Sequence, residues 1–175
     1  MNPSQYVIRI MKRRGEKRAM RTGWWFVVLL AVFSLPVTAG QEFPLRYERL
    51  EGALAELSES ERSSVNQAIV LIRRGEHSLA LVRLTALNRG RPQNSSLRIL
   101  ASYAFLQLGN LVGAFEEAKQ AHASAGGNSY KCWFLAKVAL LHGKKDVCER
   151  ELEHVRQAGD MAAEAELLAR ELTKN

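Results

Sequence analysis

The chain has 175 residues, of which 47% are apolar and 25% charged, a composition typical of one globular domain with a buried core. Its formal net charge is +7, but the charge is unevenly distributed. Residues 1–39 hold seven of the 25 basic residues and one of the 18 acidic residues, so the remainder carries a net charge of +1. Because the basic character belongs to the N-terminal segment, composition does not favour nucleic-acid binding, and we expect no nucleic-acid partner.

The N-terminal segment, residues 1–39, has the layout of a secretory signal peptide. A basic region precedes the apolar run WWFVVLLAVFSL, residues 24–35, and small residues then lead to a predicted cleavage after Ala39, with cleavage after Gly40 as the alternative. The alternative is an uncleaved inner-membrane anchor, but a membrane-spanning helix needs about 20 apolar residues and this run is shorter, so cleavage is favoured. Met11 and Met20 are alternative start sites. We expect an exported chain, periplasmic or secreted, that contacts the membrane only transiently unless the anchor is retained.

Residues 40–60 are predicted to form an N-terminal half-repeat that caps the domain. Within them, residues 45–57 place four apolar side chains on one stripe at helical spacing. These side chains are Tyr47, Leu50, Leu54 and Leu57. Ser58 and Glu61 then have the spacing of a capping box, which predicts that the next helix begins directly after Ser58.

Three glycines, Gly75, Gly109 and Gly143, recur at an interval of 34 residues. Apolar runs at helical spacing flank each one, so each unit is predicted to be two antiparallel helices joined by a turn at the glycine. Glycine suits that turn because the backbone there takes a left-handed conformation. Small residues, expected where the two helices cross, lie seven positions before and five after each glycine. They are Ala68, Ser102 and Ala136, and Ala80, Ala114 and Cys148.

This pattern resembles the tetratricopeptide-repeat family, whose 34-residue helix-turn-helix units stack into a right-handed superhelix. The matching segments are GEHSLALVRLTALNRGRP, GNLVGAFEEAKQAHA and GKKDVCERELEHV, and Pro92 matches the family's terminal proline. The resemblance implies an all-α solenoid of about eight helices. Its repeats would be residues 61–94, 95–128 and 129–162, followed by a C-terminal capping helix at residues 163–175. In that helix, Leu167, Leu168 and Leu172 are expected to point inward.

The sequence contains no motif for catalysis or cofactor binding, so we expect no enzyme activity and no cofactor. No two of the histidines and cysteines have the three- or four-residue spacing that places metal ligands on one helix face, so no metal site is expected. Acidic residues in the second helices are predicted to lie on solvated faces. These are Glu116, Glu117, Glu149, Glu151 and Glu153.

Cys132 and Cys148 leave two alternatives in an exported chain, a disulfide or two separate thiols. The repeat pattern places them near the starts of two antiparallel helices, so their heights should differ by roughly 9 Å. A disulfide requires Cα atoms within about 7 Å, which favours separate thiols.

The resemblance also implies a binding face, because in the family the first helix of each unit lines a concave face that receives peptides. The corresponding residues are Val65, Ile69, Ile72, Ile99, Tyr103, Leu106, Tyr130, Trp133, Lys137, Leu140 and Leu141. This set is mostly apolar and aromatic, which favours an apolar peptide or a partner helix. The alternative is that these side chains pack against neighbouring helices or the N-terminal half-repeat. Alanine at Trp133 would weaken partner binding in the first case and destabilise the fold in the second.

Two functions fit this sequence. The first is a non-catalytic protein–protein interaction module that acts outside the cytoplasm, with another protein or a peptide segment as its partner. The second is a self-associating envelope protein whose apolar face is buried in a homo-oligomer.

Overall fold

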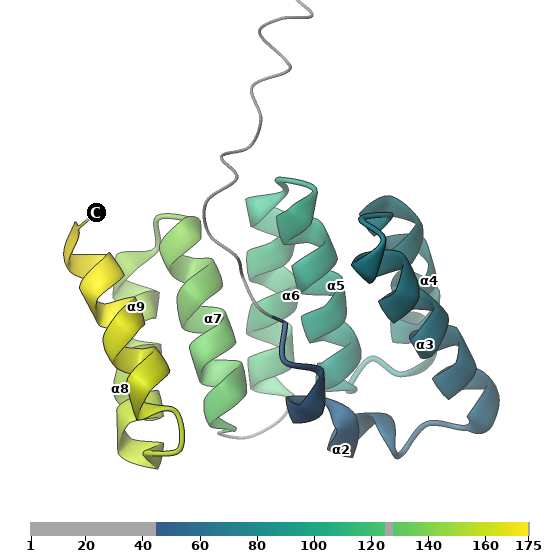
Figure 1. Ribbon diagram of the computed structural model, residues 1–175, viewed down its shortest axis with the longest axis horizontal. Helices are drawn as coiled ribbons and strands as arrows, with labels where there is room; N and C mark the ends of the chain where they lie inside the picture. The colour runs from purple at the N-terminus through teal and green to yellow at the C-terminus, as the bar shows by residue number, and fades with distance from the viewer. Residues whose placement is uncertain (1–44, 125–127, 175) are drawn as a thin grey trace, which may run out of the picture. The chain divides into compact units, whose positions relative to one another are not determined.

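Helices form all the regular structure in the part of the chain that the computed structural model describes, residues 45–124 and 128–174. All of these residues belong to one unit, Pro44–Asn175 (Figure 1). In chain order the elements are η1 (Tyr47–Arg49), α2 (Glu51–Leu54), α3 (Glu59–Arg73), α4 (His77–Gly90), α5 (Ser95–Gln107), α6 (Leu111–Ala123), α7 (Ser129–Leu141), α8 (Lys145–Ala158) and α9 (Ala162–Lys174). The domain is therefore all-α, as predicted.

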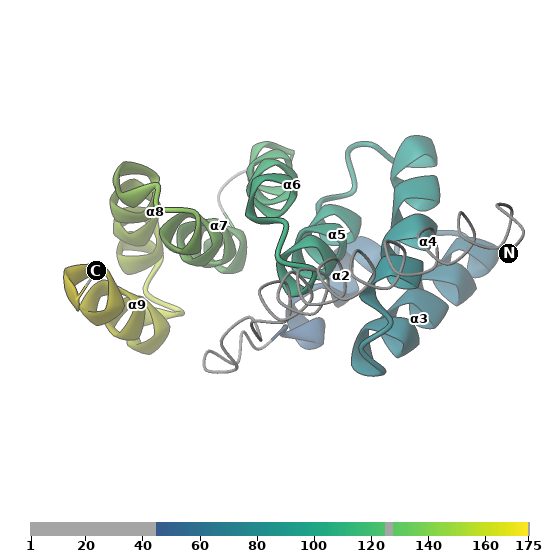
Figure 2. The ribbon, with the colours of Figure 1, turned by 90° about the horizontal axis from the view of Figure 1, so that it is seen from above.

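The helices are arranged in two layers. α3 packs on α4, α5 on α6, and α7 on α8, and the first helices of successive pairs also contact one another, as does α7 with α9. Figure 2 shows α3, α5, α7 and α9 along one side of the unit and α4, α6 and α8 along the other. We call the side formed by α3, α5, α7 and α9 the concave face.

The three glycines at 34-residue spacing end the first helix of each pair. Gly75, Gly109 and Gly143 have φ angles of 76°, 74° and 77°, so each takes the predicted left-handed conformation. In each turn the amide after the glycine donates to the carbonyl five residues earlier. These bonds join Glu76 to Leu71 (2.9 Å), Asn110 to Phe105 (2.9 Å) and Lys144 to Ala139 (2.8 Å). This is the hydrogen bond of a Schellman motif, which satisfies carbonyls that a helix end leaves unpaired.

The small residues around each glycine lie where the paired helices cross. All six predicted positions are fully buried. In the second pair, the Ser102 hydroxyl donates to the Ala114 carbonyl oxygen at 2.6 Å, which brings the side chain of α5 against the backbone of α6. Small side chains therefore set the close approach of the two helices.

Both ends of the domain differ in detail from the prediction. At the N-terminal end, residues 45–57 form two short helices, η1 and α2, where one helical stripe was expected, and Leu50 and Leu57 of that stripe are buried. At the other end, Leu167 was expected to point inward, but 60% of it is exposed. The buried stripe of α9 contains Ala165 and Leu168 instead, and Leu167 lies about 100° away from Leu168 around the helix.

The predicted capping box begins α3. The Ser58 hydroxyl accepts from the Glu61 amide, while the Glu61 carboxylate accepts from the Ser58 amide. Arg91, which follows α4, also donates to this carboxylate at 2.9 Å. The hydrogen bond from Arg91, followed by those from Ser58, lowers the pKa of Glu61 from its ordinary value of 4.5 to about 2.

This pKa shift predicts a pH-dependent contribution to stability. Because the pKa of Glu61 is lower in the folded state, its contribution is complete above pH 4.5 and is lost as the pH falls toward about 2. We expect Arg91→Gln to lower the melting temperature near neutral pH. The difference in melting temperature between the variant and the parent should then become smaller as the pH falls from 4.5 toward about 2. Thermal melts of both proteins as a function of pH test this, and a gap independent of pH would contradict it.

The predicted signal peptide, residues 1–39, lies outside the described residues. Among the helices that the structure does describe, none is long and apolar enough to cross a membrane.

Candidate functional site

The predicted binding residues lie on the first helices, but most of them are buried in the unit. Val65, Ile72, Ile99, Tyr130, Trp133, Lys137 and Leu140 are buried, whereas Ile69, Tyr103, Leu106 and Leu141 are partly exposed. A partner could therefore reach only a minority of the predicted set without moving other parts of the chain.

On α7, the predicted residues pack against one another and against other helices of the chain. Tyr130 stacks on Trp133 with ring centroids 5.9 Å apart, and Phe134 lies 6.2 Å from Tyr130. Lys137 donates to the carboxylate of Glu171 on α9. This part of the concave face packs as core, which is the alternative that the sequence left open.

A short segment of the chain itself, residues 45–50, lies on the concave face. The Arg46 amide donates to the Tyr130 hydroxyl at 3.1 Å, and the Ser96 hydroxyl donates to the Leu50 carbonyl at 3.2 Å. Burial raises the pKa of Tyr130 to about 12, so its hydroxyl stays neutral at physiological pH. In Figure 1 this dark blue segment leads into α2 at the lower end of the face, and α2 contacts α5.

Charged interactions join residues 45–50 to helices at both ends of the stack. Arg46 pairs with Glu164 on α9, and Arg49 pairs with Asp160 at 3.3 Å. The Arg73 guanidinium, at the end of α3, lies 4.8 Å from the centre of the Tyr47 ring, a cation–π distance. Residues 45–50 thus connect the first helix pair to the C-terminal helix.

Apart from Leu141 at the end of α7, the accessible remainder of the predicted set lies on α3 and α5. Ile69, Tyr103 and Leu106 are partly exposed, and Tyr103 packs edge-on against His77 with centroids 6.4 Å apart. We call these three residues the open stripe.

The outer layer carries an apolar surface that the sequence analysis did not identify. Val82 on α4 is 69% exposed, and Leu79 and Leu108 are also exposed. Val82 and Leu108 line a hollow of about 480 Å³ together with other residues of α4. The sequence does contain a signal for it: Leu79, Val82 and Ala86 have helical spacing and form a second stripe on α4, apart from the buried stripe of Ala80 and Leu84.

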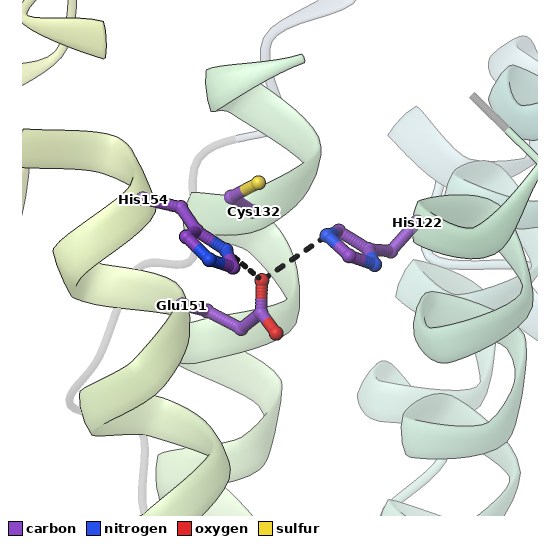
Figure 3. A group of neighbouring side chains, drawn as sticks. All are labelled: His122, Cys132, Glu151 and His154. Atoms are coloured by element: carbon purple, nitrogen blue, oxygen red, sulfur yellow. Dashed lines mark hydrogen bonds and ion pairs between the residues drawn. The ribbon is translucent and has the colours of Figure 1, made fainter. Parts of the chain in front are cut away.

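Side chains of metal-ligand type converge at a third place, between α6, α7 and α8. They are His122, Cys132, Glu151 and His154 (Figure 3). The prediction that Glu151 lies on a solvated face was wrong, because it is 2% exposed. The argument against a metal site considered only spacings within one helix, whereas these four residues meet through the packing of three helices.

Cys132 and Cys148 are separate buried thiols. Burial raises the pKa of each to about 11, so neither thiol is ionised to a reactive thiolate near neutral pH. Only Cys132 belongs to the cluster with Glu151.

Comparison with known proteins identifies the fold. No family model matches the chain, and no curated protein matches it by sequence. Among solved structures, the second tetratricopeptide-repeat domain of Spaghetti (RPAP3), bound to an HSP90 peptide, is similar with a TM-score of 0.52 and 16% identity, over 63% of this chain and 97% of that one. A mutant of MamA is similar with a TM-score of 0.47 and 19% identity, over 68% of this chain and 80% of that one.

The stacked helix pairs with a common turn define an α-solenoid, a class of protein built from repeated hairpins. Within that class, the similarity to the Spaghetti domain shows that the chain has the tetratricopeptide-repeat fold.

Proposed function

We propose that this chain is a protein-interaction module that binds an apolar peptide segment or a partner helix on its concave face. The fold supports this proposal, since a solved domain with the same fold binds a peptide. The open stripe on this face is apolar and aromatic, and aromatic side chains often dominate the energy of such interfaces.

The observation that carries the proposal is the segment 45–50 on the concave face. Tyr130 and Ser96 bind its backbone amide and carbonyl, so these two contacts require a peptide backbone rather than a particular side chain. A partner segment could make the same contacts after displacing residues 45–50. It could also extend along the open stripe beside them.

We further propose that the module acts outside the cytoplasm. Support comes from the basic region, the apolar run and the small residues within residues 1–39. Mass spectrometry of the protein from cells should then find an N-terminus at Gly40 or Gln41. A chain that retains residues 24–35 in the membrane fraction would indicate an anchor instead.

Site-specific photo-crosslinking tests the binding face. A photoreactive residue is placed at Leu106, in the open stripe, and in a matched variant at Glu153, which is exposed on α8 in the outer layer. We expect one discrete protein to crosslink from Leu106 and not from Glu153. The crosslink should weaken when Tyr103→Ala is added, because that substitution removes a neighbouring ring of the stripe. Equal crosslinking from both positions would contradict the proposal.

Self-association is the second candidate, and the exposed side chains of Leu79, Val82 and Leu108 favour it. An apolar hollow on the outer layer could be closed by a second copy of the chain. In that case a photoreactive residue at Val82 should crosslink to the protein itself, and light scattering should show a dimer that Val82→Asp converts to a monomer.

A further inference from the structure

The four side chains between α6, α7 and α8 form a set of donors that converge on one point. His122 comes from α6, Cys132 from α7, and Glu151 and His154 from α8. In Figure 3 the side chains extend toward one another from three separate helices. One potential ligand atom of each lies within 4.8 Å of those of the other three.

Glu151 is at the centre of the group. Its Oε2 atom lies 3.1 Å from His122 Nε2 and 3.3 Å from His154 Nδ1. The carboxylate is nearly fully buried, a position in which an acidic side chain requires compensating partners. Arg150 supplies one at 3.3 Å, but its own side chain is 59% exposed, so it remains largely solvated.

The donor chemistry matches zinc. Two imidazole nitrogens, one sulfur and one carboxylate oxygen are the atoms that tetrahedral zinc sites use, at zinc–nitrogen distances of about 2.0–2.1 Å and a zinc–sulfur distance of about 2.3 Å. Such bond lengths place ligand atoms roughly 3.3–3.8 Å apart in a tetrahedron. Glu151 already lies at about this distance from both histidines, at 3.1 and 3.3 Å. The longest separation in the group, at most 4.8 Å, exceeds the range by about 1 Å, which small side-chain rotations can close.

We propose that His122, Cys132, Glu151 and His154 bind one zinc ion. Four protein ligands leave no open position, so the ion would be structural rather than catalytic. It would join the second helix pair to the third, because His122 belongs to α6 and the other ligands belong to α7 and α8. Metal binding would therefore stabilise the packing of these two repeats against each other.

Titration with Co²⁺ tests the site, because Co²⁺ in zinc sites absorbs visible light and shows a sulfur-to-cobalt charge-transfer band. The full-length protein is prepared with a chelator, freed of it and titrated. We expect one equivalent of Co²⁺ to bind with tetrahedral absorption and the charge-transfer band, and Zn²⁺ to displace it. Zn²⁺ should also raise the melting temperature.

Two cysteine variants provide a matched pair. Cys132→Ala should abolish the charge-transfer band and weaken Zn²⁺ binding by at least about 100-fold, since loss of an outer-shell partner alone typically costs 10–100-fold. Cys148→Ala should bind as the parent does. Cys148 is an equally buried thiol outside the cluster, and the equivalent positions of the other pairs already hold Ala80 and Ala114.

A third variant removes a partly exposed ligand, so its effect on metal binding can be measured in a protein that still folds. His154 is 49% exposed, so His154→Gln should retain the helical circular dichroism spectrum and still weaken binding at least about tenfold. If the folded parent binds no stoichiometric Co²⁺ or Zn²⁺, the cluster is only an ion-pair network around Glu151 and the proposal fails. It also fails if His154→Gln, or a folded Cys132→Ala variant, binds as tightly as the parent.

Discussion

Replacement of Trp133 by alanine is expected to lower the free energy of unfolding by about 3–5 kcal/mol. The side chain is 6% exposed and stacks on the buried ring of Tyr130. Its helix, α7, packs against α6, α8 and α9, so neighbouring elements cannot collapse freely into the space left by the indole. The loss therefore combines the transfer energy of the ring with the cost of a cavity.

Urea unfolding of the parent and the variant measures this loss. Leu167→Ala is the control, because Leu167 is apolar but 60% exposed, and its truncation should change stability by no more than about 0.5 kcal/mol. If Trp133→Ala instead leaves stability intact and weakens partner binding by on the order of 2 kcal/mol, Trp133 belongs to the binding surface and not to the core.

The second large effect is expected at the crossing of α5 and α6. Ala114→Leu should cost about 1–3 kcal/mol of stability, because a larger side chain must push the two helices apart or adopt a strained rotamer. Ala114 is 0% exposed, and its carbonyl oxygen accepts the short hydrogen bond from Ser102 at 2.6 Å. Separation of the helices would stretch that bond as well.

Ala123→Leu is the matched control for this prediction. Ala123 lies on the same helix and is exposed, so the added side chain meets solvent and should have little effect. Thermal melts of both variants against the parent provide the comparison. Equal stability of Ala114→Leu and Ala123→Leu would mean that the small residues do not set the approach of the helices.

Local features of this fold were predictable because each depends on a few neighbouring residues. The left-handed turns at Gly75, Gly109 and Gly143 follow from the freedom of glycine, and the capping box follows from the spacing of Ser58 and Glu61. A further local signal was missed: Asn94 and Asn128, 34 residues apart, cap the first helices of two successive pairs. Asparagine is a strong N-cap residue, so this pair could have located the starts of α5 and α7.

The sites were less predictable because they depend on which helices meet. Glu151 has the charged neighbours typical of an exposed helix face, yet packing turns it toward His122 on a different helix pair. The spacing of Glu151 and His154 does place both on one face of α8, but only the approach of α6 and α7 adds the other two donors. A comparison limited to histidine and cysteine could not find the cluster.

The all-α class, the 34-residue period, the turns and the small residues at the helix crossings could be predicted, since all of these arise from local conformation and periodicity. Three features became visible only in the folded chain: residues 45–50 lie on the concave face, Trp133 and Tyr130 are buried, and four potential metal ligands meet between α6, α7 and α8. Periodicity specifies which side of a helix is apolar, but not which element covers that side. Coverage depends on contacts between residues far apart in the chain, such as Arg46 with Tyr130, and no spacing in the sequence encodes them.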